Sequence, residues 1–167
     1  MPRSPRKPLP KRRSDGARER YSSGSRWEPV VGYSRAVRVG PRVYVSGTTA
    51  FGPDGAIVGV GDPYRQTVQV LDNLDRALSA LGSERAAIVR LRIFVTDVGR
   101  SGEVTRALGE RFRPIRPAMT LVGVAGLIEP EMLVEIEADA EDLPRPGGRT
   151  RGPRPPGSRA ATAHRGE

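Results

Sequence analysis

Apolar and polar residues in the middle of this chain follow two different periods, and each period predicts a type of element. Between Arg35 and Gly47, valines occupy every second position on both sides of Gly40 and Pro41, which predicts a β-hairpin. The segment FGPDGAIV, residues 51–58, contains a Pro-Asp-Gly turn, so we expect it to join two short extended pieces.

A long helix is predicted between Asp62 and Gly82. Asp62 is a suitable N-cap, Pro63 fits the first helical position because an N–H would have no partner there, and Gly82 provides a C-terminal stop. The residues that recur between them at steps of three and four are Tyr64, Thr67, Val68, Leu71, Leu74, Leu78 and Leu81. This spacing predicts an amphipathic helix with one buried face.

Three more strands and a shorter helix are predicted after this helix. The strands cover residues 86–98, 118–125 and 132–140, and the helix covers residues 102–112. In the first of these strands one face is expected to carry Val89, Leu91, Ile93 and Val95, and the other Arg90, Arg92 and Phe94. The order of the elements predicts an α+β fold, in which a mixed sheet has two helices on one face.

The helix-free face of this sheet is expected to need a cover from outside the chain. The strand over residues 132–140 has one apolar face, formed by Met132, Val134, Ile136 and Ala138, and one face with Leu133, Glu135, Glu137 and Asp139. The strand over residues 118–125 has no polar face, and such strands are normally covered on both sides. Since two helices can cover only one face, we expect a homo-oligomer whose interface uses the helix-free face.

Composition divides the chain into three parts. The net charge is +9, of which residues 1–25 carry +6 and residues 143–167 carry +5, whereas residues 26–142 hold 14 basic and 16 acidic side chains. Both ends are rich in Arg, Pro, Gly and Ser, which predicts disordered tails around one folded domain. A basic tail can bind nucleic acid, but residues 1–20 contain no aromatic side chain for base stacking, so we do not expect nucleic acid as a partner.

Composition also excludes several kinds of chemistry. Without cysteine the chain has no disulfide and no thiol nucleophile, and its single histidine, His164, lies in the C-terminal tail. We therefore expect no metal site, and any catalysis has to use carboxylate, hydroxyl, backbone and water chemistry. The apolar run at residues 121–128 is far shorter than the ~18 residues of a membrane span, and no apolar stretch follows the basic residues near Met1, as a secretory signal would require.

Several motifs, in their order and spacing, resemble those of the Rid family, also called the YjgF family, whose members include deaminases formerly labelled L-PSP endoribonucleases. The motifs are VSG at residues 45–47, QTVQVLDNLDRALSALG at 66–82, VRLRIFVTDV at 89–98, RPAMT at 116–120 and LVEIEADA at 133–140. This resemblance covers residues 27–140. It implies a chorismate-mutase-like (YjgF-like) subunit in a cytoplasmic homotrimer, with a central β-barrel and clefts for small molecules between subunits.

The active members of this family hydrolyse short-lived imines and enamines, such as 2-aminoacrylate, to a keto acid and ammonia, and the resemblance implies no cofactor. In those members an arginine in a Pro-Ala-Arg string binds the substrate carboxylate through its planar fork. This chain has Met119 at that position, and a thioether offers neither charge nor donor. Loss of such a buried contact costs on the order of 2–5 kcal/mol, so we do not expect the standard 2-imino acids to be substrates.

The resemblance implies a site around Glu135, which would hold or activate the water. The substrate-binding residues that it implies are Tyr33, Ser46, Gly47, Met119, Thr120 and Leu121. Met119 and Leu121 would make the cleft apolar. Arg116 is the nearest substitute for the missing charge, but strand alternation is expected to turn it away from the face of Met119.

Three of these residues also have a purely structural explanation. Glu135 and the two acidic residues that follow it on the same face fit equally well as ion-pair partners of Arg90 and Arg92 on a neighbouring strand. Tyr33 fits interface packing, and Gly47 fits a backbone requirement at the end of a strand.

Three hypotheses for function follow, and the sequence leaves open whether the chain is an enzyme. The first is a Rid-family trimer that hydrolyses an imine or enamine without a critical carboxylate to a carbonyl compound and ammonia. The second is a non-catalytic trimer that binds a small molecule or acts as a scaffold. The third and weakest is RNA binding through the basic tails.

Overall fold

The computed structural model of the chain describes residues 13–14 and 18–143. Within these residues one sheet has the strand order β1-β2-β3-β4-β7-β5-β6. The strands are β1 (Arg13–Ser14), β2 (Arg18–Tyr21), β3 (Ala36–Val39), β4 (Arg42–Thr48), β5 (Ile88–Val95), β6 (Ala118–Gly123) and β7 (Val134–Glu141). The helices are α1 (Trp27–Val31), α2 (Pro63–Ala80) and α3 (Ser101–Phe112), with short 3₁₀ helices η1 (Arg85–Ala87) and η2 (Val98–Arg100). The predicted α+β class is confirmed.

The predicted hairpin is formed by β3 and β4, which pair in antiparallel orientation. Gly40 lies in the turn with φ of 57°, a left-handed conformation that glycine adopts without steric cost. The Pro-Asp-Gly segment also forms a turn, in which the N–H of Gly52 donates to the carbonyl of Ala56 at 2.7 Å. An isolated bridge between Phe51 and Ile57 joins the two extended pieces.

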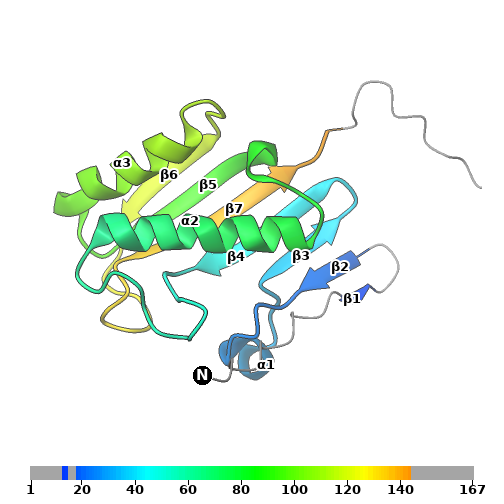
Figure 1. Cartoon of the computed structure of the whole chain (residues 1–167), viewed down its shortest axis with the longest axis horizontal. Coiled ribbons are helices and arrows are strands. Elements are labelled where there is room, and N and C mark those ends of the chain that lie inside the picture. The colour runs from blue at the N-terminus through cyan, green and yellow to red at the C-terminus, as the bar shows by residue number, and fades with distance from the viewer. Residues whose placement is uncertain (1–12, 15–17, 144–167) are drawn as a thin grey trace, which may run out of the picture.

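Local sequence signals fix both ends of α2, as predicted. The Asp62 carboxylate accepts a hydrogen bond from the backbone N–H of Arg65 at 2.9 Å, and Pro63 occupies the first helical position. The chain leaves the helix through Gly82, which has φ of 74°. The buried face of α2 packs on β4 and β7, and α3 lies beside α2 on the same face of the sheet (Figure 1).

The connection from β5 through α3 to β6 is the one parallel crossover among the paired strands that the structure describes. β7 then returns between β4 and β5 and pairs with both in antiparallel orientation. This arrangement places β7 near the middle of the sheet and leaves β6 at its edge. A residue of β7 therefore has neighbours on both sides, whereas β6 has one free side.

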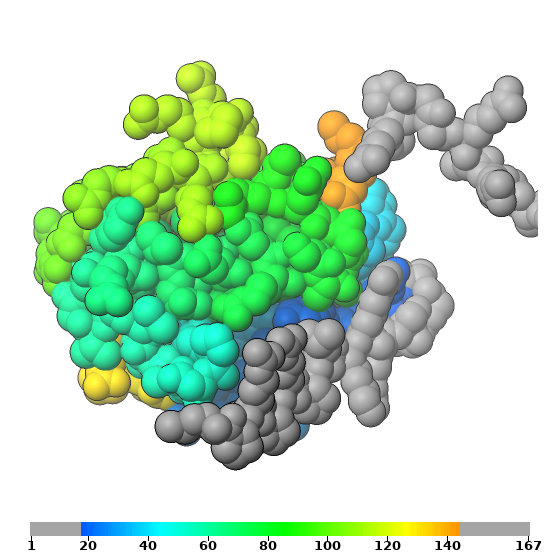
Figure 2. Space-filling view, in the orientation of Figure 1, coloured from blue at the N-terminus to red at the C-terminus, as the bar shows by residue number. Residues whose placement is uncertain are grey.

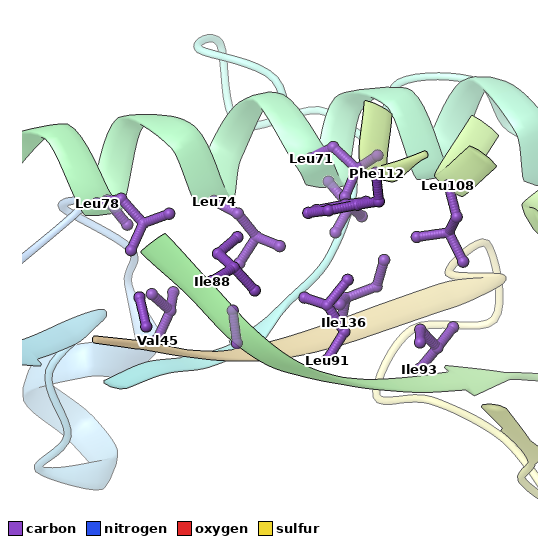
Figure 3. Packing of buried hydrophobic residues seen from close by; sticks show 14 of the residues in the cluster. Val45, Leu71, Leu74, Leu78, Ile88, Leu91, Ile93, Leu108, Phe112 and Ile136 are labelled. Carbon is purple, nitrogen blue, oxygen red and sulfur yellow. The ribbon is translucent and has the colours of Figure 1, made fainter. Parts of the chain in front are cut away.

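The hydrophobic core lies between the helices and one face of the sheet (Figure 3). Leu71, Leu74 and Leu78 of α2 point from the helix toward the sheet. Leu91 of β5 and Ile136 of β7 meet them from below, each with no more than 1% of its surface exposed. Seen from the helix side, residues of α2 and α3 and of their connecting segments cover the sheet (Figure 2). Both helices thus cover one face only.

The N-terminal boundary of the folded part differs from the prediction. Arg18–Tyr21, expected within a disordered tail of residues 1–25, form β2 and pair with β3 in antiparallel orientation. Backbone hydrogen bonds to an edge strand stabilise this segment, so its charged side chains do not prevent it from joining the sheet. The remaining residues of the two predicted tails, apart from 13–14, 22–25 and Leu143, lie outside the described residues.

One strand face is also shifted from the prediction. Val89, expected in the core with Leu91, is 49% exposed, and Ile88 is buried instead. The register between β5 and β7 is irregular between Ile88 and Arg90, and such a bulge moves one residue to the opposite face. Beyond this point the predicted alternation holds.

None of the helices in the described part of the chain is both long and apolar enough to cross a membrane.

Candidate functional site

The site predicted around Glu135 lies on the helix-free face of the sheet, which we call the open face. Three consecutive strands contribute a row of paired residues there, namely Glu135 of β7, Phe94 of β5 and Val122 of β6. Arg92 of the same face pairs with Glu137 at 3.3 Å and with Asp139 at 3.1 Å. The predicted cross-strand ion pairs are thus confirmed for these two acids. Among the residues that the structure describes, Glu135 has no ion-pair partner within 4 Å, and its cross-strand neighbour is an aromatic ring.

A bulge in β4 brings Gly47 against this carboxylate. The register between β4 and β7 shifts between Val45 and Thr48, so Ser46 and Gly47 leave the regular ladder there. A Cβ atom at Gly47 would collide with the Glu135 carboxylate. Glycine at this position therefore leaves the space that the end of the flexible Glu135 side chain occupies.

Arg35 connects Tyr33 to Gly47, although it was not predicted as a site residue. The guanidinium donates from Nη1 to the Gly47 carbonyl and, at 3.3 Å, to the Thr48 hydroxyl. From Nη2 it donates to the Tyr33 hydroxyl at 2.8 Å. The side chain is only 13% exposed, so this cation is largely withdrawn from solvent. Tyr33 and Gly47 are thus joined by one charged side chain.

A buried carboxylate supports Arg35 from the other side. Glu28 of α1 is 5% exposed, and its Oε1 lies 3.8 Å from Arg35 Nε. The same carboxylate accepts hydrogen bonds from the Ser23 backbone N–H at 3.0 Å and from the Ser22 and Ser23 hydroxyls. Buried charges are normally paired in this way because an unpaired one is costly. Glu28 therefore anchors both Arg35 and the segment that follows β2.

The environment of Glu135 raises the pKa of its carboxyl group above the ordinary value. Desolvation by burial is the largest cause, and repulsion from Glu137 adds to it, whereas the positive charge of Arg35 acts in the opposite direction. A carboxylate whose pKa is shifted toward neutrality is better suited to exchange protons with water. The geometry and the electrostatics thus agree on Glu135 as the candidate proton acceptor.

The structure brings together four of the predicted site residues. Tyr33 and Gly47 are joined through Arg35, Gly47 lies against Glu135, and the Ser46 backbone N–H donates to the Arg35 carbonyl at 3.0 Å. The Ser46 hydroxyl donates to the Ser34 carbonyl at 2.9 Å, which holds the bulge against the segment before β3. Glu135 and its neighbours thus form a compact group at one end of the open face.

The other three predicted residues lie on β6 and do not join this group within one chain. Met119 pairs with Leu91 and Leu121 pairs with Ile93, whose side chains enter the core, so Met119 and Leu121 lie on the helix-covered face. Thr120 pairs with Arg92 and shares the open face with Glu135. Met119 is 43% exposed at the free edge of the sheet. A cleft that contains both Met119 and Glu135 would therefore need two chains.

Arg116 does not replace the missing charge in this arrangement. It precedes β6 with φ of 56°, and its Nε donates to the Arg113 carbonyl at the end of α3. Strand alternation, on which the prediction rested, does not apply to it because it lies outside the strand. Arg35 is the cation that acts on Glu135, and the only sign of it in the sequence was its position two residues after Tyr33.

Two hollows on the described part of the chain are lined by residues outside this group. One of about 90 Å³ lies between the start of α2 and the end of β5, against Pro63 and Val95. A wider one lies on the surface beside Glu110 and Arg113 of the α3 region. No cluster of metal-ligating side chains occurs in the part of the chain that the structure describes.

The whole group from Ser23 to Glu135 falls within residues 23–142, which match the model of the family described as Endoribonuclease L-PSP. The chain belongs to the Rid (YjgF) family. The uncharacterized protein SCO2049 of Streptomyces coelicolor is 39% identical to this chain over 121 residues, which are 72% of this chain and 90% of that protein.

Solved structures that are similar to this chain have the same fold. Rv2704 from Mycobacterium tuberculosis, a member of the YjgF/YER057c/UK114 family, is 46% identical and matches with a TM-score of 0.68 over 74% of this chain and 98% of its own. TdcF from E. coli, crystallised with bound serine, is 26% identical and matches with a TM-score of 0.62 over 66% of this chain and 88% of its own. The predicted family and α+β fold are therefore confirmed.

Proposed function

We propose that this chain is a cytoplasmic Rid-family homotrimer that hydrolyses a reactive imine or enamine to a carbonyl compound and ammonia. The observation that carries the proposal is the position of Glu135, a carboxylate with a raised pKa beside Tyr33, Gly47 and the withdrawn cation Arg35. Such a group can accept a proton from water near neutral pH and return it. Family membership supports this type of reaction.

The reaction needs one base and a fixed geometry, because imines already hydrolyse in water. Glu135 removes a proton from a water molecule while the water oxygen bonds to the imine carbon and the C=N π electrons move to nitrogen. Glu135 returns its proton to the nitrogen, which gives a carbinolamine. The hydroxyl proton of the carbinolamine then passes to the nitrogen, the C–N bond breaks as the C=O bond forms, and ammonia leaves. An enamine first tautomerises to the imine by moving an N–H proton to its β-carbon and then follows the same route. Holding water and substrate together lowers the entropic part of the barrier.

The open face supports assembly from several chains. On this face Val122 of β6 is 41% exposed and Tyr44 of β4 is 43% exposed. Apolar side chains of this size on a sheet face favour burial against a partner. In the proposed trimer the open faces meet around a central β-barrel, and Met119 and Leu121 of one chain line a cleft with Glu135 of the next.

Met119 supports a substrate without a critical carboxylate. The resemblance places the carboxylate-binding arginine of the deaminases at this position, and a thioether provides no charged donor. Arg35 makes four contacts inside its own chain, so it is engaged before any ligand binds. We therefore propose an uncharged imine or enamine as the substrate class.

The test compares two substrates with one protein. 2-Aminoacrylate is generated in place by a serine dehydratase, an uncharged imine is prepared in parallel, and ammonia release is followed with and without the purified protein. We expect faster decay of the uncharged imine and little change for 2-aminoacrylate. Acceleration of 2-aminoacrylate equal to that by an arginine-bearing relative would contradict the role given to Met119, and no acceleration of any imine would contradict the proposed reaction.

A non-catalytic trimer that binds a small molecule is the second candidate, and the absence of a charged side chain at Met119 favours it. It predicts thermal stabilisation by imine analogues without turnover. Turnover of any imine that is lost in Glu135→Gln would rule it out. The weaker idea of RNA binding depends on tails that fall almost entirely outside the described residues.

A further inference from the structure

The contacts of Arg35 leave it little capacity to bind a ligand directly. A guanidinium has five N–H groups and no acceptor. Nη1 donates to Gly47 and Thr48, Nη2 donates to Tyr33, and Nε faces Glu28. Because these partners come from α1, β4 and the segment before β3, they hold the guanidinium from several directions. Arg35 is therefore expected to act through the groups that it contacts and not by binding a ligand itself.

The first consequence concerns the Tyr33 hydroxyl. Arg35 can only donate, so the Tyr33 oxygen is the acceptor in their 2.8 Å hydrogen bond. The proton of Tyr33 is then directed away from Arg35. Its ring also lies 5.3 Å from the guanidinium carbon, which restricts its orientation further. Tyr33 is thus prepared to donate a hydrogen bond to a group in the cleft.

The second consequence concerns the charge of Glu135. The charged groups that face this carboxylate are Glu137 on its own strand and Arg35 from the segment before β3, with Glu28 of α1 behind Arg35. β4 faces it with Gly47, and β5 faces it with Phe94, neither of which is charged. Arg92 of β5 is paired with Glu137 and Asp139. Arg35 is therefore the positive neighbour that opposes the desolvation of Glu135.

We propose that Arg35 is a positioning residue that fixes Tyr33 as a hydrogen-bond donor and keeps the Glu135 carboxylate ionised, with Glu28 as its anchor. The inference rests on the proposed function, in which Glu135 takes a proton from water, and adds that Tyr33 donates a hydrogen bond to the imine nitrogen. One side chain would thus prepare the donor and the base of the same reaction.

The electrostatic part is tested without any substrate. Carboxyl-carbon NMR follows the titration of Glu135 in the wild type, Arg35→Gln and Arg35→Lys. We expect the pKa of Glu135 to rise in Arg35→Gln, because the positive neighbour is lost, and to stay near the wild-type value in Arg35→Lys. The matched control is Arg38→Gln, since Arg38 is 15% exposed, pairs with Asp142 and donates to the Leu81 carbonyl at 2.7 Å. An unchanged pKa in Arg35→Gln, or an equal rise in Arg38→Gln, would overturn the proposal.

The positioning part is tested with an imine that the wild type hydrolyses. We expect kcat to fall about ten- to a hundredfold in Arg35→Gln and in Arg35→Lys, which loses the planar fork, with KM changed less than about threefold. The effects of Arg35→Gln and Tyr33→Phe should be less than additive in the double variant, because Arg35→Gln acts in part by misplacing the donor that Tyr33→Phe removes. A higher KM at unchanged kcat, or additive effects, would overturn the proposal. If no imine is hydrolysed, the proposed function fails, while the titration still decides whether Arg35 controls the charge of Glu135.

Discussion

The two faces of the sheet are built on different principles. The helix-covered face is complete within one chain, since side chains of α2 and α3 bury Leu91, Ile93 and Ile136 to 1% exposure or less. The open face holds acidic residues and exposed valine and tyrosine side chains. It also holds the largely buried Arg35 near Glu135, whose carboxyl pKa is raised. Stability is thus concentrated on one face, and the groups able to perform chemistry lie on the other. We therefore expect that stability and function can be changed separately.

The largest expected effect comes from shortening a buried apolar side chain between α2 and the sheet. Leu74 is 1% exposed in the middle of α2, and Leu74→Ala should lower the free energy of unfolding by about 2–5 kcal/mol, because it removes apolar contacts and leaves a cavity. Urea denaturation of purified protein measures this loss. A loss below about 1 kcal/mol would mean that this face is not the main source of stability.

A change on the open face should reduce activity with little effect on stability. Gly47→Ala pushes the terminal atoms of a flexible side chain, the Glu135 carboxylate, out of place. Displacement of a catalytic group by about 1 Å can cost about a hundredfold in rate, so we expect kcat on an imine to fall by this order.

Gly109→Ala is the matched control for this change. Gly109 lies in α3 with nothing within 4 Å of an added Cβ, so its replacement should leave activity unchanged and stabilise the helix by up to about 1 kcal/mol. Equal activity of Gly47→Ala and Gly109→Ala would show that the position of the Glu135 carboxylate is unimportant.

The assembly of the open face is tested at β6. Val122→Asp puts a charge into the proposed interface and should weaken the trimer at least about tenfold, because burial of an unpaired charge is costly. Analytical ultracentrifugation measures the shift toward smaller species. Val60→Asp, at a residue that is 60% exposed in the segment before α2, should leave the trimer intact. A trimer unaffected by Val122→Asp would place the interface elsewhere.

The smallest expected effect is a pH-dependent gain in stability. The pKa of Glu135 is raised in the folded state, so the folded protein binds this proton more tightly than the unfolded chain does. Ionisation of Glu135 therefore destabilises the folded state as the pH rises above the unfolded pKa. Glu135→Gln should raise Tm at pH 7 to 8, and the gain should disappear near pH 4. A gain that is constant with pH would contradict the cause given for the raised pKa.

Local signals made much of the fold predictable. The cap at Asp62, the stop at Gly82 and the alternating valines around Gly40 specify their elements from neighbouring residues alone. β2 was missed because its sequence, RERY, has no apolar alternation and joins the sheet through backbone hydrogen bonds. Val89 was misplaced because a one-residue bulge is not visible in a periodic pattern.

The candidate site was only partly predictable. Glu135 and Gly47 were named because their motifs resemble the family, and the structure brings them into contact. Arg35 was missed because its role depends on partners from α1 and β4, which are distant in sequence. Met119 and Glu135 lie on opposite faces of the sheet because of the registers in which β6 and β7 pair with β5. The alternation of residues within one strand does not reveal these registers.

The hydrolytic role of Glu135 is tested most directly by the rate of ammonia release from an uncharged imine, measured side by side with wild-type protein and Glu135→Gln at neutral pH. Both proteins should be trimeric and folded, so that only the proton acceptor differs. We expect the wild type to accelerate hydrolysis and Glu135→Gln to lose about a hundredfold or more of that acceleration. Equal rates with the two proteins, or no acceleration by the wild type, would contradict the assignment of the open face as a hydrolytic site.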